Sequence, residues 1–352
     1  MKKIAIDGKL IGNGCPFYII AEAGANHEGQ LDKAFQLIDA ALESGVDAIK
    51  FQNYTAAKLT TKTAQKYWDD GNKNESQFDV FDKLDKLSND DWQKIFDYAK
   101  QKGITCFSTP FDMDSVDLLE TFNVPAYKIA SADITHIPLI KKIASKKKPI
   151  FMSTGMASLS EIHDAISAIQ DEGNNEIILM HCITSYPTKP EDANLEMINK
   201  LGKEFPECVI GYSDHTLGTE IAALSVLYGS TCIEKHFTFD KSLKLSRDHR
   251  LSLIPDDFKE LKNKINLIEI SRGSEIEDYI HVESDAIKYA RRSIVSKSNI
   301  PKGTEITENM IDVKRPGTGI SPKYFSKIVG SKTVKDIPED STIQWNDIDS
   351  NQ

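Results

Sequence analysis

Short apolar runs alternate with longer amphipathic stretches through most of the chain. Each run is four to six residues long and ends abruptly in polar residues, which is typical of a strand buried on both faces. The runs that we interpret as strands are Tyr18–Ala23, Ala48–Gln52, Thr105–Thr109, Ala126–Ile129, Ile150–Ser153, Ile177–Cys182, Val209–Tyr212 and Thr231–His236.

Stretches with apolar residues at helical spacing lie between most of these strands. The clearest are Leu31–Ser44, Asp91–Lys102, Asp114–Phe122, Leu159–Glu172 and Ala222–Tyr228. Strand and helix therefore alternate about eight times between residues 16 and 270, which predicts a (β/α)8 TIM barrel in the α/β class. The alternative is an open doubly wound sheet, but the first strand is not followed by a glycine-rich dinucleotide-binding turn.

Three segments depart from this alternation. Residues 4–11 read as a hairpin turning at Asp7-Gly8, and the long polar connection from Tyr54 to Ser88 is typical of a lid or binding loop. Short β runs with Pro and Gly turns fill the C-terminal part. We therefore expect a barrel domain at 1–270, a charged linker at 271–288 and a small β-rich domain at 289–352.

Composition narrows the range of partners and compartments. A net charge of -10 argues against nucleic acid or an anionic membrane as the main partner, and no apolar run reaches membrane-spanning length. The cysteines are odd in number and scattered, so we expect reduced thiols and a cytoplasmic protein. They are Cys15, Cys106, Cys182, Cys208 and Cys232.

Two histidines lie at the ends of consecutive strands. His215 follows one strand, His236 ends the next, and a single helix separates them. Neighbouring parallel strands place their carboxyl ends side by side, so both imidazoles should face one pocket. Two imidazoles suit a divalent metal with open coordination positions, and Asp214 and Glu234 stand beside them. The alternative is that each histidine merely packs at a strand end.

The other strand ends carry lysines, hydroxyls and acids. Lys50 and Lys128 sit among apolar neighbours, where ammonium groups would oppose a phosphate or a carboxylate. With a metal and the carboxyls of Glu22 and Asp133, this set fits condensation of a phosphorylated enol with a carbonyl. A metal-dependent hydrolase would use some of the same groups.

The strand ends, taken in order, resemble the sialic acid (nonulosonate) synthase family. The matching phrases are Ile20-Ala-Glu-Ala-Gly-Ala-Asn-His-Glu-Gly29, Lys50-Phe-Gln52, Phe107-Ser-Thr-Pro-Phe111, Tyr127-Lys-Ile-Ala-Ser131, Ser153-Thr-Gly-Met156, Tyr186-Pro-Thr188, Tyr212-Ser-Asp-His-Thr216 and Glu234-Lys-His-Phe-Thr238. Arg291-Arg-Ser-Ile294 and Lys314-Arg-Pro-Gly-Thr-Gly-Ile320 resemble the antifreeze-like (SAF) domain fused to these barrels.

The resemblance implies that phosphoenolpyruvate condenses with an N-acetylmannosamine-type sugar, either N-acetylmannosamine or a 2,4-diacetamido-6-deoxy hexose, giving a nine-carbon α-keto acid and phosphate. It also implies a divalent metal, manganese foremost with magnesium or cobalt as alternatives, held by His215 and His236. These two are assigned as catalytic together with Glu22 and Asp133. The positions implied for phosphoenolpyruvate are Lys50, Gln52, Thr109, Lys128, Ser131, Ser153, Thr184 and Ser213. Those implied for the sugar are Asn74, Tyr186, Asp248 and Arg315, the last reaching into the partner subunit's site in a domain-swapped homodimer.

The chain departs from the family pattern at three places. Asp133 stands where members often carry Glu, Thr184 stands where some carry Asn, and Lys244–Arg250 lacks the Gly-Pro that commonly precedes Asp-His in the acetylneuraminate and legionaminate branches. No residue decides which acetamido sugar is the acceptor. The alternatives are another metal-dependent phosphoenolpyruvate-condensing enzyme, a Schiff-base aldolase using Lys128, and a non-catalytic glycan-binding protein whose barrel is a scaffold.

Overall fold

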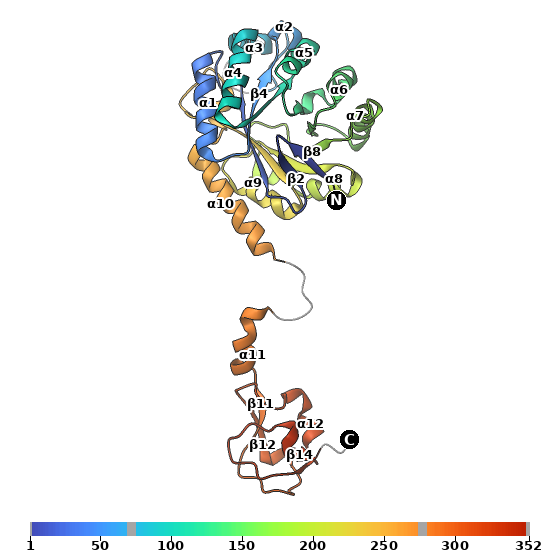
Figure 1. Ribbon diagram of the computed structural model, residues 1–352, viewed down its shortest axis with the longest axis vertical. Helices are drawn as coiled ribbons and strands as arrows, with labels where there is room; N and C mark the ends of the chain where they lie inside the picture. Colours follow the sequence, from blue (N-terminus) through green and yellow to red (C-terminus); the bar gives the residue numbers. More distant parts are fainter. Residues whose placement is uncertain (1, 69–74, 274–279, 350–352) are drawn as a thin grey trace. The chain divides into compact units, whose positions relative to one another are not determined.

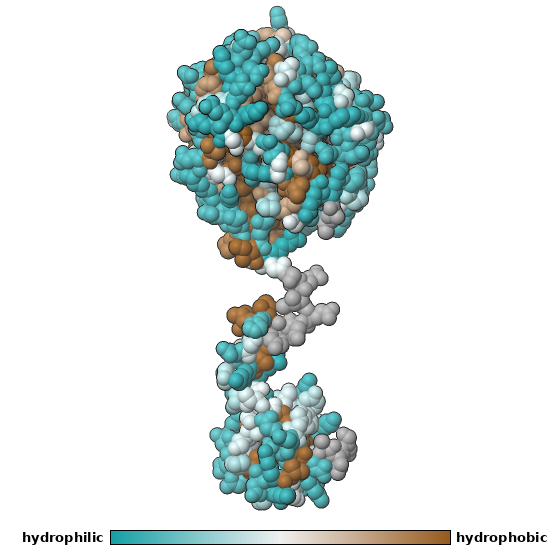
Figure 2. Space-filling view, in the orientation of Figure 1, coloured by the Kyte–Doolittle hydropathy of each residue, from teal (hydrophilic) through white to brown (hydrophobic). Residues whose placement is uncertain are grey.

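A computed structural model describes residues 2–68, 75–273 and 280–349. The chain divides into two compact units, Met1–Gly273 and Ser274–Gln352, which are described separately. Polar side chains cover most of the visible face of each unit (Figure 2). None of the helices within the described ranges is both long and apolar enough to cross a membrane.

The first unit is built on a closed barrel of eight parallel strands (Figure 1). The strands follow one another around the barrel in sequence order, and β10 pairs with β3 to close it. Their bounds are β3 (Tyr18–Gly24), β4 (Ala48–Asn53), β5 (Thr105–Pro110), β6 (Tyr127–Ile129), β7 (Ile150–Ser153), β8 (Ile177–Cys182), β9 (Val209–Asp214) and β10 (Cys232–His236). The predicted (β/α)8 barrel is confirmed.

Helices surround the barrel and bury their apolar faces against it. They are α1 (Leu31–Ser44), α4 (Asn89–Lys102), α5 (Met113–Thr121), α6 (Ile137–Ala144), α7 (Leu159–Asp171), α8 (Glu196–Glu204), α9 (Glu220–Leu224) and α10 (Pro255–Arg272). Serines cap two of them: Ser88 and Ser158 each accept a hydrogen bond from the third residue of the helix. The stretch predicted as helical at 222–228 ends as a 3₁₀ turn, Ser225–Tyr228.

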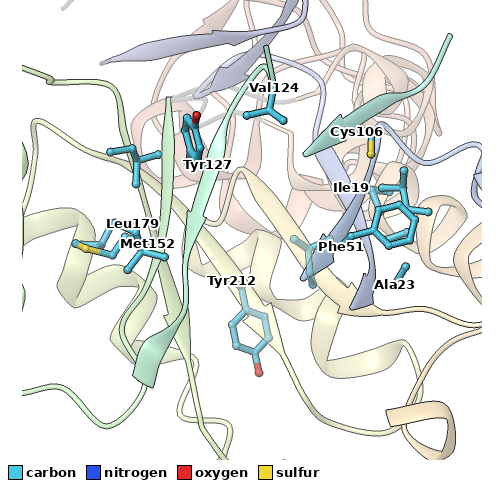
Figure 3. Close-up of a cluster of buried hydrophobic side chains, with 14 of the residues drawn as sticks. Ile19, Ala23, Phe51, Cys106, Val124, Tyr127, Met152, Leu179 and Tyr212 are labelled. Carbon is cyan, nitrogen blue, oxygen red and sulfur yellow. The ribbon is translucent and has the colours of Figure 1, made fainter. Parts of the chain in front are cut away.

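The period of two along each strand separates two buried layers. Outward-facing side chains such as Phe51, Tyr127 and Met152 pack under the helices (Figure 3). Inward-facing side chains fill the lower barrel together with Ile4, Ile6 and Ile11 of the hairpin β1 (Lys3–Ile6) and β2 (Lys9–Gly12). The inward residues of this cluster come from the first halves of the strands, so the hairpin plugs the amino-terminal end of the barrel and leaves the carboxyl-terminal end for chemistry.

The long connection after β4 is partly helical. It contains α2 (Ala56–Leu59) and α3 (Gln77–Leu84), the latter beginning with a capping box at Ser76. An aromatic cluster fixes the insertion to the barrel rim, because Phe81 packs edge-on against both Tyr54 and Trp68.

The second unit is small and has little regular structure. It contains α11 (Ser284–Ala290), β11 (Ser293–Ser296), β12 (Ile311–Lys314), α12 (Phe325–Ile328), β13 (Lys332–Thr333) and β14 (Ile348–Asp349). Two antiparallel pairs, β11 with β12 and β13 with β14, enclose a core made of isoleucines. The stretch expected to be a linker, 271–288, includes the end of α10 and most of α11.

Candidate active site

A cavity of about 530 Å³ opens at the carboxyl-terminal ends of the barrel strands. Fourteen of the residues predicted from the sequence line it. They are Glu22, Lys50, Gln52, Thr109, Lys128, Ser131, Asp133, Ser153, Thr184, Tyr186, Ser213, His215, His236 and Asp248. The remaining two are elsewhere: Asn74 lies outside the described residues, and Arg315 is an exposed residue directly after β12 in the second unit.

Two buried lysines and two buried glutamates form the floor of the cavity. Nζ of Lys50 lies 2.5 Å from Oε2 of Glu22 and 3.9 Å from Oε1 of Glu234. Nζ of Lys128 lies 2.8 Å from Oε2 of Glu234, which therefore stands between the two ammonium groups. Both lysines are only 2% exposed, so they are buried groups of the cavity and not surface charges. They face inward because they occupy alternate positions of strands whose other side chains pack under the helices.

The two glutamates differ in charge because their surroundings differ. Burial raises the pKa of Glu22 to about 7, and the neighbouring Lys50 only partly opposes this effect. Burial also acts on Glu234, but Lys128 and Lys50 outweigh it and lower its pKa to about 2. The floor thus holds one permanently ionised carboxylate and one carboxyl that can exchange a proton near neutral pH.

Asp133 supplies a second titratable carboxyl on another wall. It ends the 3₁₀ turn Ser131–Asp133 after β6, and its buried Oδ2 makes no hydrogen bond. Burial raises its pKa to about 6. A carboxyl with this pKa can accept or give a proton near pH 6.

Hydroxyl and amide groups line the space above the floor. Lys50 donates to Oγ1 of Thr109 at 2.9 Å, and Gln52 donates to Oε1 of Glu22 at 2.8 Å. Gly155 lets the loop after β7 approach closely, because a Cβ at this position would lie 2.4 Å from Oγ1 of Thr184. The hydroxyls of Ser153 and Thr184 are buried and have no hydrogen-bond partner among the described residues.

The imidazoles of His215 and His236 face each other with ring centroids 5.4 Å apart. Nδ1 of His215 lies 2.8 Å from the carbonyl oxygen of Ile183, and donation to that oxygen leaves Nε2 as the unprotonated nitrogen. Nδ1 of His236 is buried without a hydrogen-bond partner. Two imidazoles at this separation could hold one divalent ion between them.

The protein offers few further ligands to such an ion. Within the described ranges, no group of three or more His, Cys, Asp or Glu side chains could hold a metal. Asp214 is turned away from the cavity, as the period of two requires, and forms a buried ion pair of 2.6 Å with Lys235. The two imidazoles therefore fit an open metal site whose other positions are left to substrate and water.

Several cavity residues were not identified from the sequence. The insertion after β4 contributes Tyr54, Tyr67 and Phe81 to the wall, as expected of a binding loop, although its individual residues carry no recognisable motif. The sequence places Glu234 beside the histidines and Arg247 within the segment Lys244–Arg250, but it assigns neither residue a role. Their roles depend on contacts between distant parts of the chain, as when Lys128 pairs with a residue 106 positions away.

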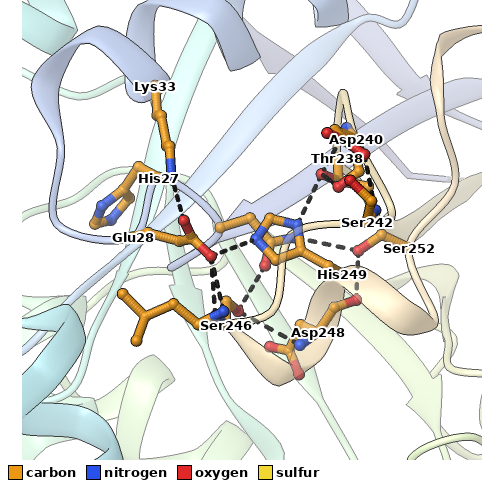
Figure 4. A network of polar contacts seen from close by, with 12 residues as sticks. His27, Glu28, Lys33, Thr238, Asp240, Ser242, Ser246, Asp248, His249 and Ser252 are labelled. Carbon is orange, nitrogen blue, oxygen red and sulfur yellow. Dashed lines mark hydrogen bonds and ion pairs between the residues drawn. The ribbon is translucent and has the colours of Figure 1, made fainter.

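A buried polar network holds the loop that carries Arg247 and Asp248 (Figure 4). Glu28 accepts backbone hydrogen bonds from Leu245 and Ser246 and forms an ion pair with Lys33. Nε2 of His249 lies 3.4 Å from the same carboxylate. These contacts tie the loop after β10 to the loop after β3, so the position of Asp248 depends on residues outside the cavity.

Unsatisfied polar atoms are concentrated in the cavity. Among the described residues, twelve buried side-chain atoms lack a hydrogen-bond partner, and eight of them belong to residues that line the cavity. One of these eight, Oε2 of Glu22, is ion-paired with Lys50, and the other seven include the hydroxyls of Ser153 and Thr184. Folded proteins leave few buried polar atoms unpaired, so this concentration indicates a cavity that a polar ligand fills.

Comparison with known proteins gives matches over both units. Residues 37–277 match the NeuB family, and residues 291–349 match the SAF domain. The N,N'-diacetyllegionaminic acid synthase of Legionella pneumophila is 38% identical over 96% of each chain. The pseudaminic acid synthase of Helicobacter pylori is 34% identical over 95% of this chain and 98% of that protein. Among solved structures, the N-acetylneuraminic acid synthetase of Leptospira borgpetersenii, determined with citrate, is 33% identical, with a TM-score of 0.72 over 81% of this chain and 95% of that one.

Proposed function

The chain belongs to the NeuB family and carries a C-terminal SAF domain, and on this premise we propose that it condenses phosphoenolpyruvate with an acetamido sugar. The chain is a phosphoenolpyruvate-condensing transferase of the nonulosonate synthase type. In the proposed reaction, the three carbons of the enol join the six of the open-chain sugar and one water is consumed. The products are a nine-carbon α-keto acid and phosphate.

The main observation that supports this proposal is the pair of buried lysines at the floor of the cavity. A small acid bearing both phosphate and carboxylate needs two cations in a water-poor site, and Lys50 and Lys128 supply them. The unpaired hydroxyls of Ser153 and Thr184 provide further hydrogen bonds to the same ligand. Glu234 keeps the two ammonium groups from repelling each other before the anion arrives.

We propose that the imidazole pair holds a divalent metal, manganese foremost and magnesium or cobalt as alternatives. A bound cation would polarise the carbonyl of the sugar aldehyde. Nδ1 of His215 is held by the Ile183 carbonyl, which orients the ring toward His236. Phe237 donates its N–H to the backbone oxygen of Glu22, and His236 is opposite Glu22 in the pairing of β10 with β3.

Glu22 and Asp133 are the two groups suited to move protons. A carboxyl with a pKa of about 7 or about 6 can be either acid or base at the pH of a cell. Their positions on different walls of the cavity allow one to serve the incoming water and the other the sugar oxygen.

The proposed acceptor site also includes Arg315 from a second subunit. The SAF unit places Arg315 at an exposed position after β12, where it is available to a partner subunit. We propose a homodimer in which each SAF unit supplies this guanidinium to the acceptor site of the other chain.

The rival uses of the barrel are less consistent with the site. Nζ of Lys128 lies 2.8 Å from Oε2 of Glu234, so this nitrogen is engaged in a buried ion pair and is not placed as the free nucleophile of a Schiff-base aldolase. A non-catalytic scaffold would leave two buried lysines and unpaired cavity groups without purpose.

The test is a coupled measurement of phosphate release and keto-acid mass. Protein freed of metal with a chelator is incubated with phosphoenolpyruvate, manganese and one acetamido sugar of a panel. Control reactions omit each of these three components in turn. The proposal predicts phosphate release only when all three are present, with one nine-carbon product. Phosphate release without a sugar, or undiminished turnover after removal of metal, would contradict it.

A further inference from the structure

Arg247 and Asp248 present an unused donor and an unused acceptor side by side in the cavity. Both residues line it. Nη1 of Arg247 and Oδ1 of Asp248 are buried, and neither has a hydrogen-bond partner in the described part of the chain. Nε of Arg247 lies 3.5 Å from Oδ1 of Asp248, which is a charge contact and not a hydrogen bond.

Aromatic rings hold the guanidinium in place. Its central carbon lies 3.7 Å from the ring centroid of Trp68, 5.2 Å from that of Tyr186 and 5.5 Å from that of Tyr67. These distances are those of cation–π contacts, and stacking of this kind restricts a planar guanidinium more than an ammonium. Tyr67 and Tyr186 also line the cavity, so an apolar wall adjoins the free donor and acceptor.

A secondary amide matches this arrangement. Its carbonyl accepts one hydrogen bond, its N–H donates one, and its methyl group packs on aromatic faces. We propose that Arg247 and Asp248 form the site that recognises an acetamido group of the acceptor sugar, with Nη1 donating to the amide oxygen and Oδ1 accepting from the amide N–H. The inference rests on the proposed condensation and specifies what that site selects.

Other substituents satisfy the site less well. A carboxylate or phosphate would accept from Arg247 but would meet the carboxylate of Asp248 directly beside it. A hydroxyl can donate and accept, but it has no methyl group to cover Tyr67 and Tyr186. The acetamido group alone among these uses the donor, the acceptor and the apolar wall.

The experiment compares acceptors that differ by a single acetamido group. One pair is mannose and N-acetylmannosamine. The other is a 2-acetamido-6-deoxy hexose and the corresponding 2,4-diacetamido-6-deoxy hexose. The ratio of kcat/KM within each pair is measured for the wild type, for Arg247→Gln and Arg247→Lys, and for Lys244→Gln. The last variant removes an exposed charge from the same loop.

In Arg247→Gln, the kcat/KM preference for the acceptor with the additional acetamido group should fall about 10- to 100-fold in one of the two pairs. This is the size expected for the loss of a hydrogen bond to a charged group. Arg247→Lys should lose most of the same selectivity, because an ammonium lacks the planar fork. The KM for phosphoenolpyruvate should stay within about twofold in both variants, which shows that the site is still folded, and Lys244→Gln should match the wild type.

Both ratios unchanged in Arg247→Gln would overturn the acetamido site while leaving the condensation intact. Equal losses on all four acceptors would assign Arg247 a structural role and would also overturn it. If the wild type releases no phosphate with any acetamido sugar, the proposed function fails, and the inference fails with it.

Discussion

Nζ of Lys128 lies 2.8 Å from Oε2 of Glu234 at the floor of the barrel, and Lys50 approaches the other oxygen of the same carboxylate. One anion thus separates two cations in a buried space. Such an arrangement is stable only while the charges balance, because burial makes each unpaired charge costly. The floor is therefore organised around an internal counter-ion.

Glu234→Gln should weaken the folded state and strengthen binding of the anionic substrate. Loss of the carboxylate leaves the buried ammonium of Lys128 without its counter-ion, at a cost of about 3 kcal/mol in the free energy of unfolding. Phosphoenolpyruvate should restore part of this loss, so it should raise the Tm of the variant more than that of the wild type. Thermal unfolding with and without the ligand measures both effects, and equal shifts would show that Glu234 does not act as a counter-ion. Glu43→Gln, on the exposed face of α1, is the control.

Activity should depend on pH through Asp133 and Glu22, whose pKa values are raised to about 6 and about 7. If the ionised form of Asp133 is the working base, kcat/KM rises as pH increases through about 6, and Asp133→Asn removes that limb. Glu22→Gln should remove the change near pH 7 instead. Profiles recorded from pH 5 to pH 8 separate the two roles, and a wild-type profile without either limb would exclude both residues from proton transfer.

Asp133 should also affect stability, in a direction set by its raised pKa. The carboxyl is protonated more readily in the folded state than its ordinary value of 3.8 allows, so the folded state binds more protons between pH 3.8 and about 6. Its contribution is fully present below pH 3.8 and is lost as pH rises through about 6. Relative to Asp133→Asn, the wild type should become less stable over that interval, as measured by denaturant unfolding at several pH values. A constant difference between the two proteins would show that the side chain is not buried in solution.

His215→Ala and His236→Ala should each abolish metal binding without unfolding the protein. The two imidazoles are the proposed protein ligands of the ion, so each variant removes one of two ligands. Equilibrium dialysis with manganese should show stoichiometric binding by the wild type and none by either single variant or by the double variant. His163→Ala, on the exposed side of α7, should bind as the wild type does. Undiminished manganese in the double variant would place the ion elsewhere.

Glu28→Gln should loosen the loop that carries Arg247 and Asp248. The charged carboxylate holds two backbone N–H groups and Lys33, and hydrogen bonds to charged groups contribute about 1.5–3 kcal/mol each. We expect the KM for the sugar to rise roughly tenfold while the KM for phosphoenolpyruvate is unchanged. Steady-state kinetics with each substrate varied in turn distinguishes this from general destabilisation, which would reduce the amount of active enzyme without altering either KM.

Arg315→Ala should raise the KM for the sugar more than that for phosphoenolpyruvate, because the proposed contact is to the acceptor. Lys302→Ala, another exposed cation of the same unit, should leave both constants unchanged. Equal effects of Arg315→Ala on the two substrates would remove the proposed sugar contact.

Much of the barrel could be predicted because its signal is local. Each strand is an uninterrupted apolar run, and the polar side chains that end or interrupt it, such as Lys50 and His236, reach one cavity once parallel strands are adjacent. Asp214 shows the limit of that reasoning, since one step along β9 turns its side chain away from the cavity toward Lys235.

Contacts between distant segments were not predictable in the same way. The packing of Arg247 against Trp68 joins residues 179 positions apart, and no periodicity relates the two. Nor does the sequence of the connection after β4 reveal which aromatic side chains face the barrel. For the second unit, the sequence predicts only a small β-rich domain and not its individual strands. Two-residue strands such as β13 are stabilised by pairing with distant partners.

The plug that the amino-terminal hairpin forms implies an order of events during turnover. Glu234 precedes His236 by two residues on β10, so the lysine floor lies one inward-facing layer nearer the plug than the imidazoles do. Molecules arriving through the carboxyl-terminal end reach the imidazoles first, and a sugar seated there would block the way to the lysines. In the proposed condensation, phosphoenolpyruvate would then have to load before the acceptor, and the nine-carbon product would have to leave before phosphate.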